Sequence, residues 1–427
     1  MKFDIGTLYD KLINELRKVD TQMMVYYLLL IICGLFIQLD ITSASGTLHF
    51  FLKQFFLSLT AIFFCLLIFL FWKIKWFKWS FWIFYLFTLG LLIYVLHHGE
   101  DILGAMRVLR VNLIVTSISV QPSLLARLVL VILFARVLSS RENLIANSSV
   151  VPFVKNFFPL LLFTGIYYIQ ILKENHLSAV LTSGFTLISL LFLANIRKAT
   201  IAILIIFGLI LGSFVVVFQK DGKFTFPNMS TIARTEQTTA QSDDINDELA
   251  TKQPEEKESF RIGRIESFIE SSLIIRWITG NKTNNGMDRN NRESIICLTT
   301  GKVIGCGANG GMGKLKYLPE PRTDFVFAII AEEFGLLGAL FIIFLYMGLV
   351  IRGISISSHQ KSMFNRIIGY GFSLNIFYNI IIHIGAVAGC LPTTGVTLPF
   401  ISQGGSSMIV NSMAIGILLI LGKQETV

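Results

Sequence analysis

The chain has 427 residues, of which 53% are hydrophobic and only 15% are charged, and its mean hydropathy is +0.68. Soluble globular proteins carry roughly 25% charged residues, so this composition excludes an ordinary water-soluble domain. The net charge of +9 is explained by lysines and arginines that gather in short loops on one side of the apolar segments. We therefore expect contact with anionic membrane lipid and no nucleic-acid partner.

Ten apolar segments approach the length of roughly 17 to 25 residues that a membrane-spanning helix needs. They predict an all-α integral membrane protein, a polytopic bundle of about ten transmembrane helices with one large extracytoplasmic loop. Before them, residues 1–22 place apolar side chains at helical spacing between charges, which predicts an amphipathic helix at the cytoplasmic surface. The predicted spans are Met23–Ile41, Phe50–Trp72, Trp79–Leu96, Leu124–Leu138, Phe157–Leu172, Leu177–Ala194, Thr200–Phe218, Asp324–Ile351, Ile367–Ala388 and Ser406–Leu421.

The loops between the spans predict the orientation of the chain. Because lysine and arginine favour the cytoplasmic side, both termini are expected there, including a short tail over residues 423–427. The large loop, residues 219–323, then lies outside and joins spans one to seven (23–218) to spans eight to ten (324–422). Its segment 228–259 is rich in Thr, Gln, Ser, Asp and Glu and poor in aromatic residues, which is typical of disorder.

The sequence shows no metal-ligand spacing among its six histidines and no nucleotide-binding glycine motif. We therefore assign no metal ligand, and the cofactor stays unknown, with a divalent cation left open. Cys297 and Cys306 share the large loop, and the sequence leaves open whether they pair or stay as free thiols.

The segment LPEPRTDFVFAIIAEEFGLLG, from Leu318 to Gly338, places acids at the start of and within an apolar helix. Asp324 is open to two interpretations: a cap that offsets the helix dipole, or a functional carboxylate. Glu332 and Glu333 follow about 12 to 14 Å further along a continuous helix. Ionisable groups at membrane depth are costly, so we expect at least one of these glutamates to pair with Arg127 of the fourth span.

The segment GAVAGCLPTTGVTLPFISQGGSS, from Gly385 to Ser407, has no charge and contains several helix-breaking residues, among them Pro392, Pro399 and Gly404. Non-helical backbone is tolerated at membrane depth only when it is buried in protein or lines a wet cavity. We therefore expect a re-entrant segment over residues 389–405.

These two segments resemble the motifs of the SEDS family of cell-wall polymerases, which includes FtsW, RodA and SpoVE. The family's LPE-x-x-TDFIFA-x-x-x-EE-x-G stretch is matched from Leu318 to Gly335, and its P-x-x-G-x-x-LPF-x-S-x-GGSS stretch from Pro392 to Ser407. Shorter matches are Phe260, Arg261 and Arg264 to a YRxxR motif, and Gly104, Ala105, Arg107, Gln121, Pro122 and Ser123 to an NGAxRW…IQPSE region. The wording of the long motifs is most similar to the FtsW branch.

The resemblance implies a peptidoglycan glycosyltransferase that polymerises Lipid II, an undecaprenyl-pyrophosphate-linked sugar, at the outer face of the bacterial inner membrane during septal division. It further implies an inverting transfer with Asp324 as the essential carboxylate, and as partners a class B penicillin-binding protein transpeptidase and other divisome proteins. The substrate-binding residues that it suggests are Arg107, Arg261, Arg264, Lys316, Glu320, Arg322, Thr323, Ser402, Gly404, Gly405, Ser406 and Ser407. Arg127, Glu332, Glu333, Pro392 and Pro399 are assigned structural roles within the membrane.

The chain departs from the family pattern in its secondary positions. Leu103, Val108, Leu124, Asn175 and Gln403 replace the usual Asn, Trp, Glu, Asp and Tyr. Two other functions compatible with the family's shape are a flippase for lipid-linked precursors and a scaffold that recruits a transpeptidase. The polar groups concentrate on the outer half, which favours the polymerase over a flippase, and a scaffold has no need of Asp324.

Overall fold

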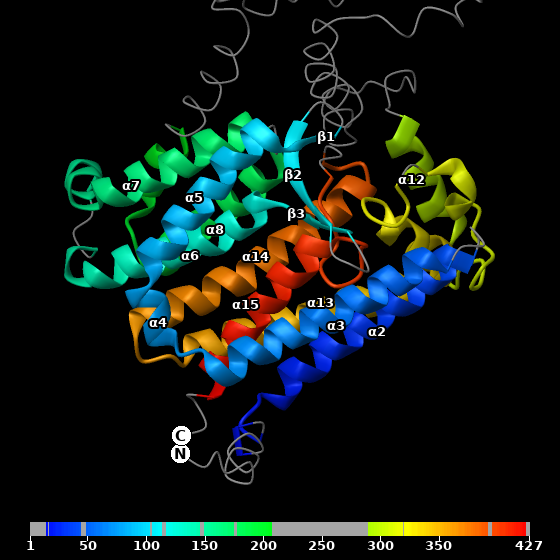
Figure 1. Cartoon of the computed structure of the whole chain (residues 1–427), viewed down its shortest axis with the longest axis horizontal. Coiled ribbons are helices and arrows are strands. Elements are labelled where there is room, and N and C mark those ends of the chain that lie inside the picture. The colour runs from blue at the N-terminus through cyan, green and yellow to red at the C-terminus, as the bar shows by residue number, and fades with distance from the viewer. Residues whose placement is uncertain are drawn as a thin grey trace, which may run out of the picture.

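The computed structural model describes residues 14–15, 17–43, 48–102, 105–112, 117–145, 149–174, 177–206, 289–318, 320–391 and 395–423. Figure 1 shows a bundle of long helices, with a small group of β-strands at its upper side and the short helix α12 at the upper right. Within these ranges, eight helices are long and apolar enough to cross a membrane. The predicted fold class, a polytopic helical membrane protein, is thereby confirmed.

The helices of the first half follow the apolar segments of the sequence. They are α2 (Thr21–Ser43), α3 (His49–Phe71), α4 (Ile74–Trp79), α5 (Phe81–His98), α6 (Pro122–Ser140), the single turn η1 (Glu142–Leu144), α7 (Val150–Lys173) and α8 (Leu177–Leu193). Residues 198–206 are helical at the start of the seventh predicted span. The rest of that span, the predicted disordered segment 228–259 and most of the predicted N-terminal helix lie outside the described residues.

The second half contains the short helix α12 (Arg289–Thr300), the turn η3 (Gly313–Tyr317), and the three long helices α13 (Val326–Ser358), α14 (Met363–Val387) and α15 (Gly405–Lys423). α7 begins earlier than predicted, at Val150, and is kinked at Phe157, two residues before Pro159. Proline has no N–H to donate and its ring disturbs the preceding turn, which accounts for the kink.

Local chemistry fixes several helix ends. α6 begins with Pro122, whose missing N–H costs nothing in the first turn. α2 begins after Asp20, whose carboxylate accepts a 2.9 Å hydrogen bond from the Met23 N–H. The same carboxylate accepts hydrogen bonds from Arg352 of α13, with Nε–Oδ2 at 3.0 Å. This ion pair ties the start of α2 to the far end of α13.

A three-stranded antiparallel sheet, which the sequence did not predict, connects α5 to α6. Its strands are β1 (Glu100–Ile102), β2 (Ala105–Asn112) and β3 (Ser117–Val120), in the order β1-β2-β3. β2 packs on α5 and α6, and β3 packs on the beginning of α15. The sheet therefore covers the end of the bundle at which α15 begins.

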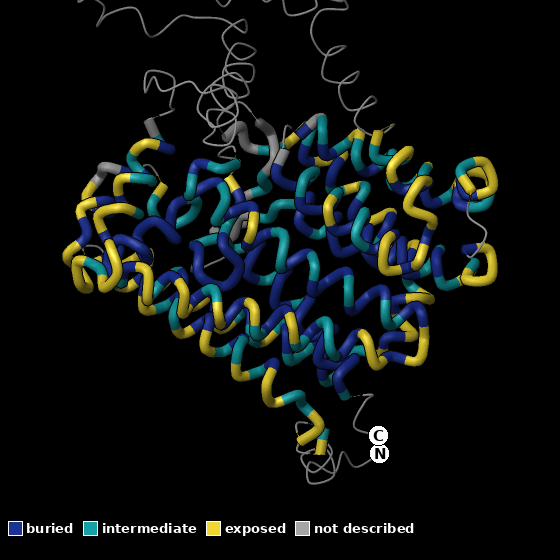
Figure 2. The backbone as a smooth tube through the Cα atoms, turned by 180° about the vertical axis from the view of Figure 1, so that it is seen from behind, coloured by how far each residue is buried: buried dark blue, intermediate teal, exposed yellow. Residues whose placement is uncertain are grey.

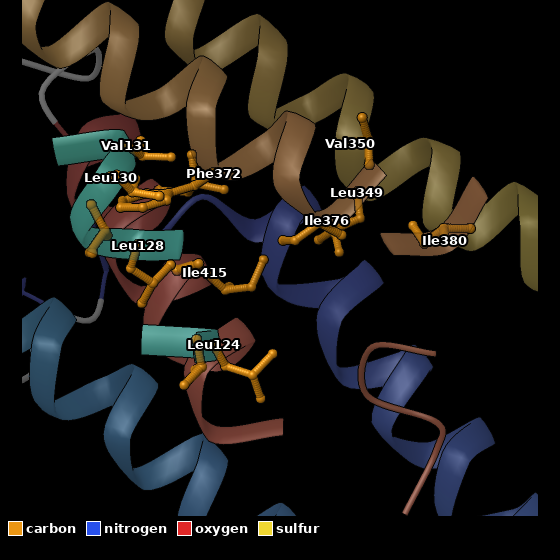
Figure 3. Close-up of a cluster of buried hydrophobic side chains, with 14 of the residues drawn as sticks. Leu124, Leu128, Leu130, Val131, Leu349, Val350, Phe372, Ile376, Ile380 and Ile415 are labelled. Atoms are coloured by element: carbon orange, nitrogen blue, oxygen red, sulfur yellow. The ribbon is translucent and has the colours of Figure 1, made fainter. Parts of the chain in front are cut away.

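The core lies around α14, which packs against α6, α8, α13 and α15. Figure 3 shows apolar side chains of α6, α13, α14 and α15 meeting there, among them Leu128, Val350, Phe372 and Ile415. In Figure 2 the buried positions run through the middle of the bundle, while many exposed positions lie on its rims. Most of the exposed side chains on α2, α3 and α13 are large and apolar, as expected of surfaces that face lipid.

Candidate functional site

Asp324 lies just before α13, outside the helix proper. Phe325 occupies the N-cap position, and the helix begins at Val326. The Asp324 N–H donates to the Glu320 carbonyl at 3.2 Å, which closes a tight turn whose first residue, Glu320, has φ of +48°. Asp324 therefore does not occupy the N-cap position, which was one of the two interpretations of this residue from the sequence.

The backbone beside Asp324 comes from the segment between α14 and α15. A methyl group placed on Gly395 would lie only 3.5 Å from Oδ2 of Asp324, and Gly395 has φ of +68°. The positive φ favours glycine there, because a side chain would strain the backbone, whereas 3.5 Å is an ordinary contact distance. Gly395, which is exposed, thus lies beside the Asp324 carboxylate.

Residues 395–404 are non-helical and mostly buried, in agreement with the expected interruption of the helices. Hydrogen bonds join them to the turn that carries Asp324. The Ser402 hydroxyl donates to the Thr323 carbonyl at 2.6 Å, and the Gln403 N–H donates to the Arg322 carbonyl at 2.9 Å. This buried non-helical backbone has its polar groups engaged by protein, as the membrane environment requires.

α2 holds the same turn from another side. Gln38 donates from Nε2 to the carbonyls of Arg322 at 3.0 Å and Ile401 at 3.2 Å. Gly34 allows this approach, because a methyl group there would lie 2.5 Å from the Phe400 carbonyl oxygen. Gln38 is buried, and the sequence analysis did not single it out. The only signal was a polar residue inside an otherwise apolar helix.

The predicted substrate-binding serines make internal hydrogen bonds. Ser406 accepts from the Gln121 N–H at 3.0 Å, and Ser407 accepts from the Thr397 hydroxyl at 2.8 Å. The Pro399 carbonyl accepts a hydrogen bond from the Tyr346 hydroxyl. Together with Gly404 and Gly405, these residues shape the start of α15 beside the Asp324 turn.

α13 is broken at Gly335, which corrects the prediction of one continuous helix from Asp324. Gly335 has φ of +64° and ψ of −164°, so the chain forms a short helix over residues 326–334 and a long one over 336–358. The break leaves main-chain groups unpaired within the helix. The loop that follows α12, residues 301–318, satisfies these groups. The N–H groups of Cys306 and Gly307 donate to the carbonyls of Glu332 and Glu333, at 3.0 and 2.9 Å.

The loop also supplies acceptors on the other side of the break. The N–H groups of Leu336 and Leu337 donate to the carbonyls of Lys302 and Val303, at 3.0 and 3.1 Å. The segment from Lys302 to Gly307 therefore docks on the broken helix. Cys306 is exposed and Cys297 is buried, and both are free thiols.

Glu332 and Glu333 are buried at this break, but they do not pair with Arg127. Glu332 accepts hydrogen bonds from the N–H groups of Met312 and Gly313, at 2.9 and 3.0 Å. Glu333 forms an ion pair with Lys314, with Oε1 and Nζ 2.6 Å apart. The predicted structural role of the glutamates fits these contacts, whereas the predicted partner is wrong.

Arg127 instead lies deep between α6 and α14, where Nη1 donates to Oδ1 of Asn379 at 2.7 Å. Asn379 in turn donates to Asn375 at 3.1 Å. The side chain is 4% exposed. The sequence identified Arg127 as a buried charge, but its hydrogen-bond acceptor is the amide oxygen of Asn379 on α14 in place of a carboxylate.

The remaining predicted site residues are described only in part. Arg322 lies with its guanidinium 3.8 Å from the centre of the Phe50 ring, an arrangement typical of a cation–π contact. Arg107 is on β2 and Lys316 in η3, but their side chains lie outside the description. So do Arg261, Arg264 and Pro392. Among the described residues, no three His, Cys, Asp or Glu side chains gather as metal ligands do.

The chain is similar to known proteins over nearly its whole length. The FtsW/RodA/SpoVE family model, described as cell cycle protein, matches residues 18–248 and 258–427. A probable peptidoglycan glycosyltransferase FtsW of Buchnera aphidicola is 30% identical over 376 residues, which cover 87% of this chain and 83% of that protein. Another, from Coxiella burnetii, is 29% identical over 334 residues and covers 77% and 74%.

Solved structures show the same architecture. A chain from a peptidoglycan synthase complex, studied for its coordination of polymerization and crosslinking, superimposes with a TM-score of 0.64 at 19% identity and covers 95% of this chain and 98% of that chain. The rod shape determining protein RodA of Thermus thermophilus gives a TM-score of 0.59 at 19% identity and covers 95% and 97%. At these identities the likeness establishes the fold.

Proposed function

This chain belongs to the FtsW/RodA/SpoVE family of cell cycle proteins, and from this we infer that it is a peptidoglycan glycosyltransferase with its active site at Asp324. The observation that carries the assignment is the position of this carboxylate. It lies just before α13, in a turn that hydrogen bonds from Gln38 and Ser402 hold beside the exposed Gly395.

The proposed reaction needs one base. The acceptor sugar hydroxyl attacks the anomeric carbon of the donor, and its proton passes to the Asp324 carboxylate. A new carbon–oxygen bond forms as the bond to the lipid pyrophosphate breaks, and the pyrophosphate leaves with the electron pair. Because attack and departure occur on opposite faces, the configuration at the anomeric carbon is inverted. The donor already carries a good leaving group, so a second catalytic carboxylate is not needed.

Cations are expected to bind the pyrophosphate as its charge develops. Arg107, Arg261, Arg264 and Lys316 are proposed for this role on the basis of the family resemblance. Arg322 lies two residues before Asp324 but stacks on Phe50, and this contact supports a role in holding the rim of the site.

We propose Lipid II as the substrate and the outer face of the bacterial inner membrane as the place of reaction. The bias of lysine and arginine in the loops supports cytoplasmic termini and an external position for residues 219–323. The family description, cell cycle protein, supports a role in cell division, and we propose the division septum as its place. A class B penicillin-binding protein transpeptidase is proposed as the partner, by analogy with the synthase complex of the same fold.

Replacement of Asp324 tests the assignment. Asn retains the size and capping ability of Asp but has no carboxylate, so Asp324→Asn should lose strand synthesis from Lipid II by about 10² to 10⁴-fold. Thermal unfolding of the purified protein should stay near that of wild type. Glu142→Gln, which neutralises an exposed carboxylate in η1, is the matched control and should retain full activity.

Asp324→Ala separates catalysis from capping. A pure capping role predicts that Asn is tolerated while Ala costs about 1 kcal/mol of stability. Normal glycan synthesis by Asp324→Asn would overturn the catalytic assignment and favour a flippase or a scaffold.

A further inference from the structure

Lys314 is a buried cation outside the proposed reaction. It lies in η3, and its side chain is only 1% exposed. Its ammonium contacts two carboxylates, Oδ2 of Asp40 at 2.7 Å and Oε1 of Glu333 at 2.6 Å. Taking these charges out of water is expensive, and the cost is met only while all three groups stay together.

The three groups come from different parts of the chain. Asp40 lies near the end of α2, and Glu333 lies next to last in the short helix 326–334, at the break of α13. Lys314 belongs to the loop that docks on this break through the main-chain bonds of Cys306 and Gly307. Lys314 therefore fastens the short helix to both the loop and α2.

The short helix leads directly to the candidate active site. Glu333 lies nine positions after Asp324, about 13 Å along a helix. α2 holds the other end as well, because Gln38 binds the Arg322 carbonyl. The segment from Arg322 to Glu333 is thus attached to α2 at both ends, by Gln38 and by Lys314 through Asp40.

We propose that Lys314 is a positioning residue for Asp324: its ion pairs with Glu333 and Asp40 set the position of the helix 326–334 and so of the carboxylate that precedes it. The proposal rests on the proposed function of Asp324. It requires no contact between Lys314 and substrate. Misplacement of a catalytic group by about 1 Å costs about 10²-fold in rate, so a distant anchor is enough to control turnover.

The test is Lys314→Met, which keeps the length of the side chain and removes the charge. We expect kcat for strand synthesis from Lipid II to fall about 10²-fold while KM changes little, because Lys314 itself makes no contact with substrate. Lys314→Arg should recover much of the rate, because it restores a cation between the two carboxylates. Hydrogen exchange should speed up in peptides covering residues 311–313 and 326–334.

Arg352→Met is the matched control. It removes the cation of the ion pair with Asp20 at the other end of the same helix, so it should lower the unfolding temperature but leave kcat unchanged. If Lys314→Met does not fold, the double variant Lys314→Met/Glu333→Gln removes one of the two stranded carboxylates as well. It should fold and still turn over slowly.

Three outcomes would overturn the proposal. They are a folded Lys314→Met or double variant with wild-type kcat, a loss confined to KM, and a slow variant whose 326–334 segment exchanges as in wild type. Failure of the proposed function gives a different result, since Asp324→Asn would then remain active.

Discussion

Glu174 illustrates how burial at a single residue sets a response to pH. It follows α7, has no exposed surface, and its burial raises the pKa to about 8, against a smaller opposing effect of the Ser123 hydroxyl. The ordinary value is 4.5, so the folded state holds this proton more tightly than the unfolded state. The contribution of Glu174 to stability is complete below about pH 4.5 and is lost as the pH rises through about 8.

Glu174→Gln should therefore stabilise the protein at alkaline pH. Glutamine resembles the protonated acid, so the thermal unfolding midpoint of the variant should exceed that of wild type at pH 9. The gap should close towards pH 5. Unfolding scans of both proteins in the same detergent across this range provide the measurement. A gap of equal size at pH 5 and pH 9 would show that Glu174 does not titrate between folded and unfolded states.

At the scale of elements, the break in α13 makes a sharp prediction for Gly335. A side chain at φ of +64° is strained by about 1 to 3 kcal/mol, and a methyl group would lie 2.4 Å from the Gly305 nitrogen. Gly335→Ala should lower the unfolding temperature and reduce strand synthesis, because the docked loop must move. Both effects are measurable on the purified variant.

Gly90→Ala is the natural comparison for this change. Gly90 lies inside α5 with nothing within 4 Å of a methyl group, so alanine should leave activity intact and stabilise by about 0.5 to 1 kcal/mol. Similar behaviour of the two variants would mean that the break has no special demand for glycine.

The elements also show which features a sequence can reveal. α2, α3 and α5 lie close to their predicted spans because the length of an apolar run reports bilayer thickness directly. The break at Gly335 was missed, because it depends on bonds from a loop some thirty residues earlier as well as on the glycine. The sheet of β1 to β3 was missed as well, because β1 and β3 are short and the eight residues of β2 show no strict alternation of apolar and polar side chains.

Some features of the candidate site could also be predicted from the sequence, and others could not. The motifs placed Asp324, Thr323 and Ser402 in one functional group, and the structure brings them together. The partner of Glu333 was wrong, because Arg127 and Lys314 are equally plausible cations until the fold decides which one is near. Gln38 was missed, since a single amide in an apolar helix carries no spacing to recognise.

At the scale of the whole molecule, residues 228–259 are predicted to be dispensable. Their polar composition buries too little apolar surface to offset the entropy of ordering, and the match to the family model is interrupted at residues 249–257 within them. A deletion of 228–259 should synthesise strands at close to the wild-type rate. A Gly/Ser segment of equal length is the control for spacing, and loss of all activity in a stably inserted deletion would refute the prediction.

The break in α13 also bears on how far the reacting groups lie from water. Residues 336–358 alone form a helix about 34 Å long, enough to cross a hydrocarbon layer of about 30 Å. The preceding nine residues are thus released from spanning and can lie within the headgroup layer with Asp324. On the proposed assignment of Asp324, a lipid-linked sugar would meet the carboxylate at the level of its own phosphates, and a lengthening polysaccharide would leave sideways into the aqueous phase. A polymerase built in this way needs no pore, and the bilayer stays sealed while the product grows.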